Sequence, residues 1–242
     1  MSVSGGQLVS DTAMVLAAGM GKRMRPLTAS QPKPLVRVAG KPLIDHALDR
    51  LDEAGIARAV VNVHYLADAL EAHVIERESP SVTISDERAL LLETGGGLVK
   101  AQEQLPDPFF CLNADNIWLD GPKNAFADLS ARWDAQEMDA LLLLVPHVRA
   151  CNFTGPGDFY MDPAGRLSRR RASRIAPFIY TGIQLVSHRL LRDAPDGAFS
   201  TNLLWNRAIE EDRLYGVAFT GQWFEVGTPQ AIRPTEDALR RG

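Results

Sequence analysis

Short apolar runs alternate with amphipathic segments through the first half of the chain. Four runs are short, apolar or β-branched and bounded by polar or turn residues, which predicts strands. Three segments between them are predicted as helices, the first with a proline at its first position and a glycine after its end. The predicted strands are Ala13–Ala17, Arg58–Val63, Ser81–Ser85 and Pro108–Leu112, and the predicted helices run from Pro42 to Ala54, from Leu66 to Glu76 and from Gly95 to about Gln104.

Strand and helix alternate along this half, which predicts right-handed crossovers and an α/β fold. The expected architecture is a Rossmann-like, mostly parallel but mixed sheet with helices on both faces. In such a sheet, ligands bind at the carboxyl ends of the strands. Three segments follow such ends or lie close to them: Asp115, the turn after the first strand, and the segment around Gly95. We therefore expect these three segments to meet in one crevice.

Past Val145 the pattern is less regular. Residues 154–167 (TGPGDFYMDPAGRL) are rich in Gly, Pro and Asp and are predicted as loops. The further predicted elements are a strand at Phe178–Val186, a helix near Thr201–Glu211, a strand that ends at Glu225 and a terminal helix from Pro229 to Arg241. We expect a flexible tail over residues 1–11 and one domain over residues 12–242.

Composition narrows the class of protein without indicating its chemistry. The chain has 242 residues, 45% of them hydrophobic and 23% charged, and its formal net charge of −4 gives no electrostatic footprint for nucleic acid. Its longest apolar stretch, Ala140–Val145, is too short to cross a bilayer, and residues 1–12 lack the pattern of a targeting signal. We expect a cytoplasmic protein with no membrane partner. Cys111 and Cys151 fit neither a zinc spacing nor a disulfide framework, so reduced structural thiols are expected.

The stretch Leu16–Met24 (LAAGMGKRM) places two glycines and two cations directly after the first predicted strand. Glycines let backbone N–H groups approach an anion closely, and Lys22 and Arg23 supply positive charge, so the pattern suits phosphate. A tight turn before a solvated helix start would have the same pattern. Two common phosphate motifs are excluded: a dinucleotide fingerprint would need glycine in place of Met24, and a P-loop would need Ser or Thr in place of Arg23.

Lys33 is the next candidate, within Gln31-Pro32-Lys33-Pro34-Leu35. The flanking prolines hold the backbone extended and exclude a helix through this segment, so the backbone fixes the direction in which the lysine side chain projects. A solvated lysine in a proline-rich loop is the alternative. The short distance in sequence from the glycine-rich turn favours a shared phosphate site. No Gly-x-Ser-x-Gly elbow is present and the histidines form no partner pattern, which argues against hydrolase triads.

Together, the glycine-rich turn and Pro32-Lys33-Pro34-Leu35 resemble the signature of the sugar-1-phosphate nucleotidyltransferase family. Three later segments resemble its nucleoside-contacting loop, its metal-binding aspartate turn and its late metal motif. They are Glu93-Thr94-Gly95-Gly96-Gly97, Asn113-Ala114-Asp115 and Trp223-Phe224-Glu225-Val226-Gly227-Thr228. Within the family, LETGGG, Gly157-Asp158-Phe159 and the short length most resemble the N-acetylmuramate-1-phosphate uridylyltransferases of cell-wall recycling.

The resemblance implies transfer of a nucleotidyl group from a nucleoside triphosphate to a sugar 1-phosphate, with release of pyrophosphate. UTP and N-acetylmuramate 1-phosphate are the implied substrates, and Mg²⁺ is the implied cofactor. The resemblance also implies a nucleotide-binding half over about residues 12–120 and a sugar-phosphate-binding half over about residues 121–242. The implied catalytic residues are Arg23, Lys33 and Lys22. The implied nucleotide-binding residues are Ala17, Gly19, Gly21, Glu93, Thr94 and Gly95; the sugar-binding residues are Asn113, Asp158, Tyr180, Thr181 and Gly182; and the metal ligands are Asp115 and Glu225.

Two positions depart from the family pattern. Ala114 stands where the family commonly has glycine, and Glu225 stands where it has aspartate. The extra methylene of Glu225 moves the carboxylate by roughly one bond length, and octahedral Mg²⁺ tolerates misplacement poorly. The alternatives are a guanylyl- or cytidylyltransferase of another sugar 1-phosphate, and a non-catalytic nucleotide-sugar-binding regulatory protein. A glycosyltransferase would usually carry an Asp-x-Asp motif, which Asn113-Ala114-Asp115 does not supply.

Overall fold

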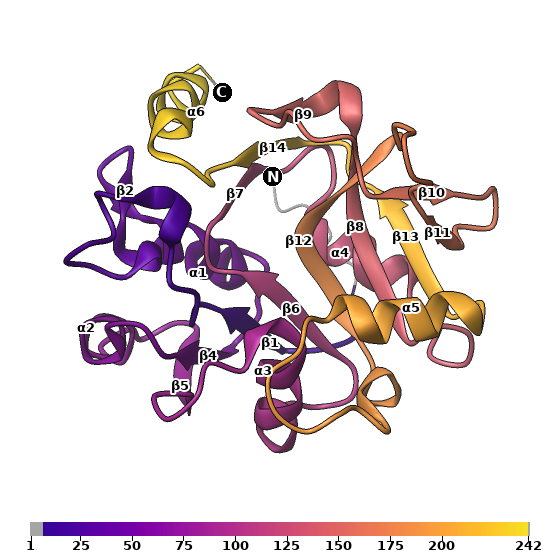
Figure 1. Cartoon of the computed structure of the whole chain (residues 1–242), viewed down its shortest axis with the longest axis horizontal. Coiled ribbons are helices and arrows are strands. Elements are labelled where there is room, and N and C mark those ends of the chain that lie inside the picture. Colours follow the sequence, from indigo (N-terminus) through magenta and orange to yellow (C-terminus); the bar gives the residue numbers. More distant parts are fainter. Residues whose placement is uncertain (1–6, 242) are drawn as a thin grey trace.

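The computed structural model of the protein describes residues 7–241 and contains a nine-stranded mixed sheet (Figure 1). Seven strands follow the order β11-β10-β12-β6-β1-β4-β5, while β8 pairs with β12 and β13 pairs with β8. The strands are β1 (Thr12–Leu16), β4 (Arg58–Val63), β5 (Ser81–Asp86), β6 (Phe109–Asn113), β8 (Ala140–Pro146), β10 (Phe159–Met161), β11 (Leu167–Arg169), β12 (Phe178–Val186) and β13 (Leu214–Ala218).

The first half of the chain forms four parallel strands of this sheet, and in the second half β13 pairs in parallel with β8. Strand β1 lies between β6 and β4, and β4 pairs with β5, all in parallel register. The second half attaches through β12, which runs antiparallel to β6, β8 and β10. The carboxyl ends of β1, β4 and β6 therefore meet at one edge, as expected from the alternation of strands and helices. The prediction of a mostly parallel but mixed sheet is confirmed.

Two small sheets complete the β-structure. Strand β14 (Gln222–Glu225) pairs antiparallel with β7 (Asn116–Leu119) and parallel with β9 (Ala150–Cys151). Strands β2 (Arg37–Val38) and β3 (Lys41–Pro42) form a hairpin, and a helix near the C-terminus lies beside it in Figure 1. The β7–β14 pair brings residue 225 next to the turn after β6, across more than 100 positions of sequence.

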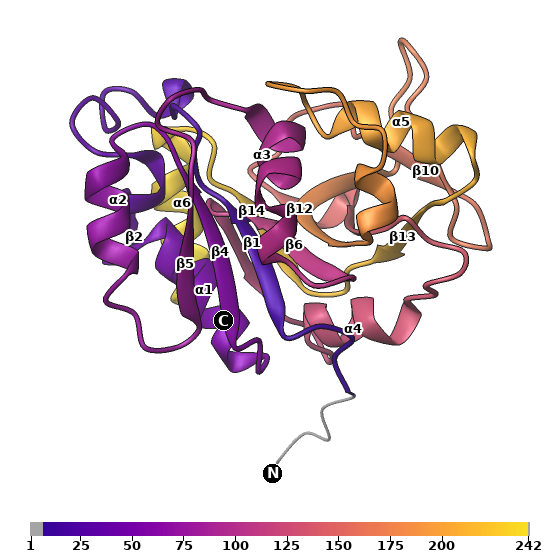
Figure 2. The same ribbon diagram turned by 90° about the horizontal axis from the view of Figure 1, so that it is seen from below.

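Helices cover both faces of the sheet, which confirms that prediction as well (Figure 2). Residues of α1, α2 and α4 join one buried apolar cluster, and residues of α3 and α5 join another on the opposite face. A third cluster lies under the small sheet and the terminal helix. The helices are α1 (Leu43–Glu53), α2 (Ala67–Val74), α3 (Glu93–Ala101), α4 (Ala125–Arg132), α5 (Asn202–Glu210) and α6 (Ile232–Leu239), with short 3-10 turns at 22–24, 33–35, 102–104, 147–149, 188–191 and 229–231.

Several local predictions are wrong. Helix α1 begins at Leu43, because Pro42 is extended and pairs in the β2–β3 hairpin. Helix α3 begins at Glu93 rather than at Gly95, so the three glycines lie inside its first turns. Residues 154–167 are not all loop, since β10 and the start of β11 form a hairpin there.

The predicted tail is also only partly described. Residues 1–6 of that prediction lie outside the described residues. In the described part, residues 7–11, Leu8 packs against the first apolar cluster and the Val9 N–H donates to Ser130 Oγ at 3.3 Å. This part is therefore held against the domain. Within residues 7–241, no helix is long and apolar enough to cross a membrane.

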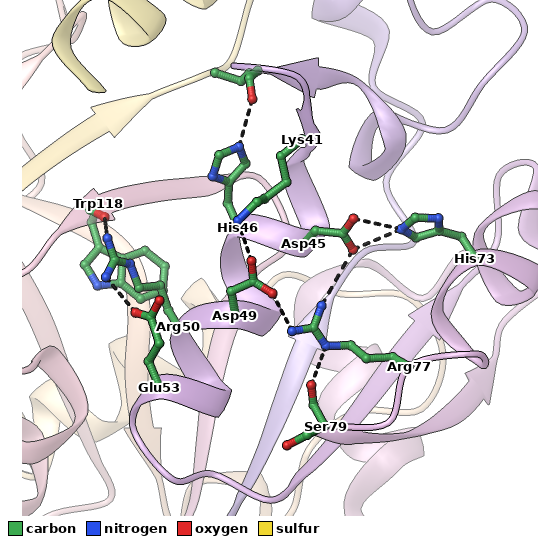
Figure 3. A network of polar contacts seen from close by, with 11 residues as sticks. Lys41, Asp45, His46, Asp49, Arg50, Glu53, His73, Arg77, Ser79 and Trp118 are labelled. Carbon is green, nitrogen blue, oxygen red and sulfur yellow. Dashed lines mark hydrogen bonds and ion pairs between the residues drawn. The ribbon is translucent and has the colours of Figure 1, made fainter. Parts of the chain in front are cut away.

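A polar network joins α1 to α2 and its following turn (Figure 3). Asp49 on α1 accepts hydrogen bonds from Arg77 Nη2 and Lys41 Nζ, both at 2.5 Å. Asp45, one turn earlier, accepts from the His73 ring at 2.9 Å. None of these side chains lines the cavities described below. The network therefore serves as a reference for effects on stability alone.

Candidate active site

The glycine-rich turn leaves β1 and closes on Lys33. Gly21 has a left-handed backbone (φ 59°) and precedes the 3-10 turn Lys22–Met24. A Cβ at Gly21 would lie 2.9 Å from the Cβ of Lys33, which is closer than real Cβ contacts allow. Thr28 Oγ1 donates to the Gly21 carbonyl at 2.9 Å and fixes the turn. Both the backbone angle and the close approach therefore require glycine at this position.

Lys33 projects from a rigid segment, although not from a fully extended one. Pro32 is extended, but Lys33–Leu35 forms a single 3-10 turn with Pro34 inside it, so the prediction that the prolines exclude helical geometry here is wrong. The physical reason is that one 3-10 turn tolerates proline near its start. The lysine side chain is 13% exposed, and its Nζ forms an ion pair with Asp115 Oδ2. The two residues most important to the prediction therefore touch.

Asp115 lies in the tight turn between β6 and β7. The N–H of Ala114 donates to the Leu16 carbonyl at 3.0 Å, so this turn is tied to the start of the glycine-rich turn. Asn113 ends β6 beside Leu16 in parallel register. This backbone link is what a parallel pair provides at its carboxyl end, and it places Asp115 against Lys33.

Glu225 reaches the same region from β14. In the β7–β14 ladder it is the partner of Asn116, the residue that follows Asp115. Its Oε1 lies 3.5 Å from Arg23 Nη1, and the two side chains are 32% and 70% exposed. The arrangement therefore holds two pairs of opposite charge next to each other, Lys33 with Asp115 and Arg23 with Glu225.

A cavity of about 570 Å³ opens at the carboxyl ends of β1 and β6. Ten of the sixteen sequence-predicted residues line it, while the buried Gly95 does not. The N–H of Gly95 donates to the Phe199 carbonyl at 2.8 Å instead. The lining residues among the predictions are Ala17, Gly19, Gly21, Lys22, Arg23, Lys33, Glu93, Thr94, Asn113 and Asp115.

Two buried polar residues that sequence reasoning missed hold the walls of this cavity together. Asn62 Oδ1 accepts from the Ala17 N–H at 2.6 Å, and Asn62 Nδ2 donates to Glu87 Oε1 at 2.7 Å. Glu87 is fully buried, and its Oε2 accepts from the Leu92 N–H at 3.0 Å. One network thus joins the glycine-rich turn to the segment before α3. The signal in the sequence was an asparagine inside the apolar strand Arg58–Val63, since a buried amide needs a partner.

A second cavity of about 170 Å³ adjoins the first between β12 and the small sheet. Arg23, Asn113, Asp115 and Gly227 line both cavities. The remaining predicted residues, Asp158, Tyr180, Thr181, Gly182 and Glu225, line the second. All predicted residues except Gly95 therefore lie on two connected cavities.

The side chains in the second cavity are held by hydrogen bonds of their own. Asp158 Oδ2 accepts from the Tyr180 N–H at 2.9 Å. The Tyr180 ring packs edge-on against Trp205 at 4.9 Å, and burial, with a contribution from Cys111, raises the pKa of its hydroxyl well above the usual value. Thr181 Oγ1 donates to the Leu143 carbonyl at 2.8 Å. The hydroxyls of Tyr180 and Thr181 are thus neutral groups that shape the wall.

Gly182 and Asn116 lie at the base of the second cavity. Gly182 has φ 84°, and a Cβ there would lie 2.5 Å from Asn116 Nδ2 and 2.7 Å from Asn113 Nδ2. Asn116 is 5% exposed, and its Nδ2 has no hydrogen-bond partner among the described residues. A buried amide donor without a partner is costly, so this group is available to a ligand. Asn116 is not among the residues predicted from the sequence.

The chain is similar to known nucleotidyl transferases. The nucleotidyl transferase family model matches residues 12–153. An N-acetylmuramate alpha-1-phosphate uridylyltransferase from Caulobacter vibrioides is 46% identical, over 94% of this chain and 96% of its own length. A protein of the same name from Neisseria meningitidis is 33% identical over 89% of this chain and 93% of its own.

Among solved structures, the inositol-1-phosphate CTP transferase from T. maritima has a TM-score of 0.79 at 17% identity, covering 98% of this chain and 97% of that chain. At that identity the likeness concerns the fold. From the family match and the identity to the two relatives, the chain belongs to the nucleotidyl transferase family, as one of its sugar-1-phosphate nucleotidyltransferases.

Proposed function

We propose that this enzyme transfers the uridylyl group of UTP to N-acetylmuramate 1-phosphate. The substrates are those in the name of the 46% identical relative, which spans 94% of this chain. The observation that carries the proposal is the ion pair between Lys33 and Asp115 at the junction of the two cavities. A nucleotide in the larger cavity and a sugar phosphate in the smaller one would meet at this point.

The reaction joins two polyanions, so local positive charge is its main requirement. Two unit charges about 4 Å apart repel by roughly 4 kcal/mol at an effective dielectric constant of about 20. In this proposal Lys22 and Arg23, both exposed on the larger cavity, bind the leaving pyrophosphate. Lys33 bridges the α-phosphate and the incoming phosphate. The incoming phosphate is already ionised, so positioning and charge stabilisation supply the catalysis and no protein base is needed.

Asp115 and Glu225 would hold Mg²⁺. Carboxylate oxygens are hard donors, and Mg²⁺ in phosphate-transfer sites is commonly held by one or two carboxylates together with substrate phosphates. The residues present fit that pattern: Asp115 lies in the turn directly before β7, and Glu225 lies on β14, where it is the ladder partner of Asn116 on β7. When bound, the ion would screen the α-phosphate oxygens. Separation of the carboxylates from Lys33 and Arg23 would free those cations for the phosphates.

The nucleoside would lie against the backbone of the larger cavity. We assign contacts with it to Ala17, Gly19, Gly21, Glu93 and Thr94, with Gly95 acting from behind through its bond to the Phe199 carbonyl. The sugar would lie in the smaller cavity. We assign contacts with it to Asn113, Asp158, Tyr180, Thr181 and Gly182, and add the unpaired amide of Asn116.

Release of pyrophosphate from a grid of substrates tests the proposal. The purified protein is mixed with Mg²⁺, each of the nucleoside triphosphates and a panel of sugar 1-phosphates. The expected result is the fastest release with UTP and N-acetylmuramate 1-phosphate. Faster release with GTP and mannose 1-phosphate, or with CTP and any sugar, would replace the proposed substrates, and no release with any pair would leave a nucleotide-sugar-binding protein.

A further inference from the structure

The loop between β11 and β12, residues 170–177, is braced by one of its own arginines. Arg170 Nη1 donates to the carbonyls of Arg171 and Arg174, at 3.4 and 3.2 Å. Ser173 takes a left-handed backbone conformation with φ 58° inside the turn. An internal guanidinium that joins two carbonyls gives an exposed loop a defined shape.

Two further arginines of this loop project without partners. Arg171 and Arg174 are exposed, and within residues 7–241 neither side chain forms an ion pair or a hydrogen bond. Arg169, just before the loop, differs from them. Its guanidinium stacks over Phe159 at 4.8 Å and over Trp205 at 5.6 Å. The two unpartnered guanidinium groups are therefore available to an anion.

The loop forms the outer layer of one wall of the smaller cavity. The N–H of Arg170 donates to the Asp158 carbonyl at 2.9 Å, and the N–H of Ala176 donates to the Pro156 carbonyl at 2.8 Å. Asp158 and Phe153, at the two ends of the segment that the loop flanks, both line that cavity. A substituent that leaves the cavity over this wall would meet the arginine-bearing loop.

The lining of the smaller cavity is itself unfavourable for a second anionic group. Its charged side chains are the carboxylates of Asp115, Asp158 and Glu225 against the single guanidinium of Arg23. Asp115 and Glu225 are the proposed metal ligands, and Asp158 is one of the proposed sugar contacts. A carboxylate on the sugar would be repelled by Asp158 and would need a cation outside the lining.

We infer that Arg171 and Arg174 bind the carboxylate of an acidic sugar 1-phosphate and thereby distinguish it from the neutral sugar. This inference rests on the proposed function, because N-acetylmuramate is N-acetylglucosamine with a lactyl ether that ends in a carboxylate. The guanidinium group is a planar fork that matches a carboxylate. Both arginines act on substrate binding and not on the transfer step.

The test compares two sugar phosphates that differ only in the lactyl ether. For the wild type and the variant Arg171→Ala/Arg174→Ala, KM and kcat are measured with N-acetylmuramate 1-phosphate, and the inhibition constant or KM with N-acetylglucosamine 1-phosphate. An exposed ion pair contributes little singly, so loss of both arginines is expected to raise KM for the acidic sugar about tenfold. The KM or inhibition constant of the neutral sugar, the KM of UTP and kcat should each change less than about twofold.

Controls separate charge from structure. Arg192→Ala removes an exposed arginine that forms no side-chain bond within residues 7–241, and it should change none of these constants. Arg171→Lys/Arg174→Lys should restore most of the affinity, and Arg171→Glu/Arg174→Glu should weaken it beyond the alanine variant. Calorimetric titration of the two sugar phosphates measures the same discrimination without turnover.

An equal loss for both sugars would overturn the inference, because the loop would then only shape the cavity. A change confined to the KM of UTP, or no change at all, would overturn it too. Failure of the wild type to use UTP with N-acetylmuramate 1-phosphate is a different result: it would reject the proposed function, while calorimetry would still decide whether the two arginines favour the acidic sugar.

Discussion

The two cavities of this enzyme are built in different ways. The larger one is lined mainly by residues of short contiguous motifs, and two buried side chains, Asn62 and Glu87, hold those motifs together. The smaller one is lined by side chains from β7, β12 and β14 and from the loop before β10, which are far apart in the sequence. A cavity made by local motifs tolerates change elsewhere in the chain, whereas one made by converging side chains changes with each of its walls.

This difference predicts separable defects. Substitutions where the two cavities meet should lower kcat. Those in the buried Asn62–Glu87 network should raise KM for the nucleotide, and those at the base of the smaller cavity should raise KM for the sugar phosphate. A substitution in the remote network around Asp49 should affect stability alone.

Lys33→Ala should produce the largest effect, because it removes the cation of the larger cavity that pairs with Asp115, a residue that lines both cavities. We expect kcat to fall by about 10² to 10³, the typical cost of losing one charge-stabilising donor. Folding should be retained, since Asp115 is 32% exposed and remains solvated without its partner. Lys41→Ala is the matched control, because Lys41 pairs with Asp49 in the remote network. Near-native turnover of Lys33→Ala would remove this lysine from the mechanism.

Glu87→Ala should damage the larger cavity alone. It leaves Asn62 Nδ2 and the Leu92 N–H without their acceptor, at a cost of about 1–3 kcal/mol per buried group. We expect a lower melting temperature and an approximately tenfold higher KM for UTP, with KM for the sugar phosphate unchanged. Glu87→Gln keeps an acceptor and should lose less. Equal changes in both KM values would show that the two cavities are not independent.

Gly182→Ala should damage the smaller cavity and leave the larger one intact. The new Cβ would collide with the amides of Asn113 and Asn116, and φ of 84° strains any L side chain. We expect KM for the sugar phosphate to rise roughly fivefold to tenfold, and stability to fall by about 1–3 kcal/mol, while KM for UTP is retained. Steady-state kinetics with each substrate varied in turn measures this; a defect in UTP binding of the same size would contradict it.

Asp49→Asn should have the smallest effect, and only on stability. Burial tends to raise the pKa of Asp49, but hydrogen bonds from Lys41 and Arg77 outweigh it, so the folded-state pKa lies below the ordinary value of 3.8. Its contribution is therefore present above that value and is lost as the pH falls through the lower folded-state pKa. We expect Asp49→Asn to lower the free energy of unfolding by less than about 1 kcal/mol, because the carboxylate is partly solvated.

Thermal unfolding of the wild type and Asp49→Asn at several pH values tests this. The difference in melting temperature should be largest near neutral pH and should shrink below pH 3.8. A difference that grows as the pH falls would contradict the sign, and an altered KM for either substrate would show that the network is not remote in function.

Most of the parallel half of the fold could be predicted from the sequence, whereas much of the second half could not. The strands Arg58–Val63 and Phe178–Val186 were predicted with the bounds that the structure shows. Strand β8, by contrast, is a continuous apolar run, which is typical of a buried strand but also of a buried helix segment. Strand β7 has only four residues and is stabilised by pairing with β14, far along the chain. Strand β13 and helix α4 were likewise not predicted.

By itself, the sequence was enough to select the candidate site residues, because glycines, prolines and charged groups in short motifs act through local geometry that neighbouring residues specify. It also determined the order of strands and helices in the parallel half. Only the tertiary structure decided that Lys33 pairs with Asp115, 82 positions away, and that Asn62, Glu87 and Asn116 belong to the site. Contacts between distant segments depend on how sheets pair and pack, and that pairing leaves no pattern in either segment alone.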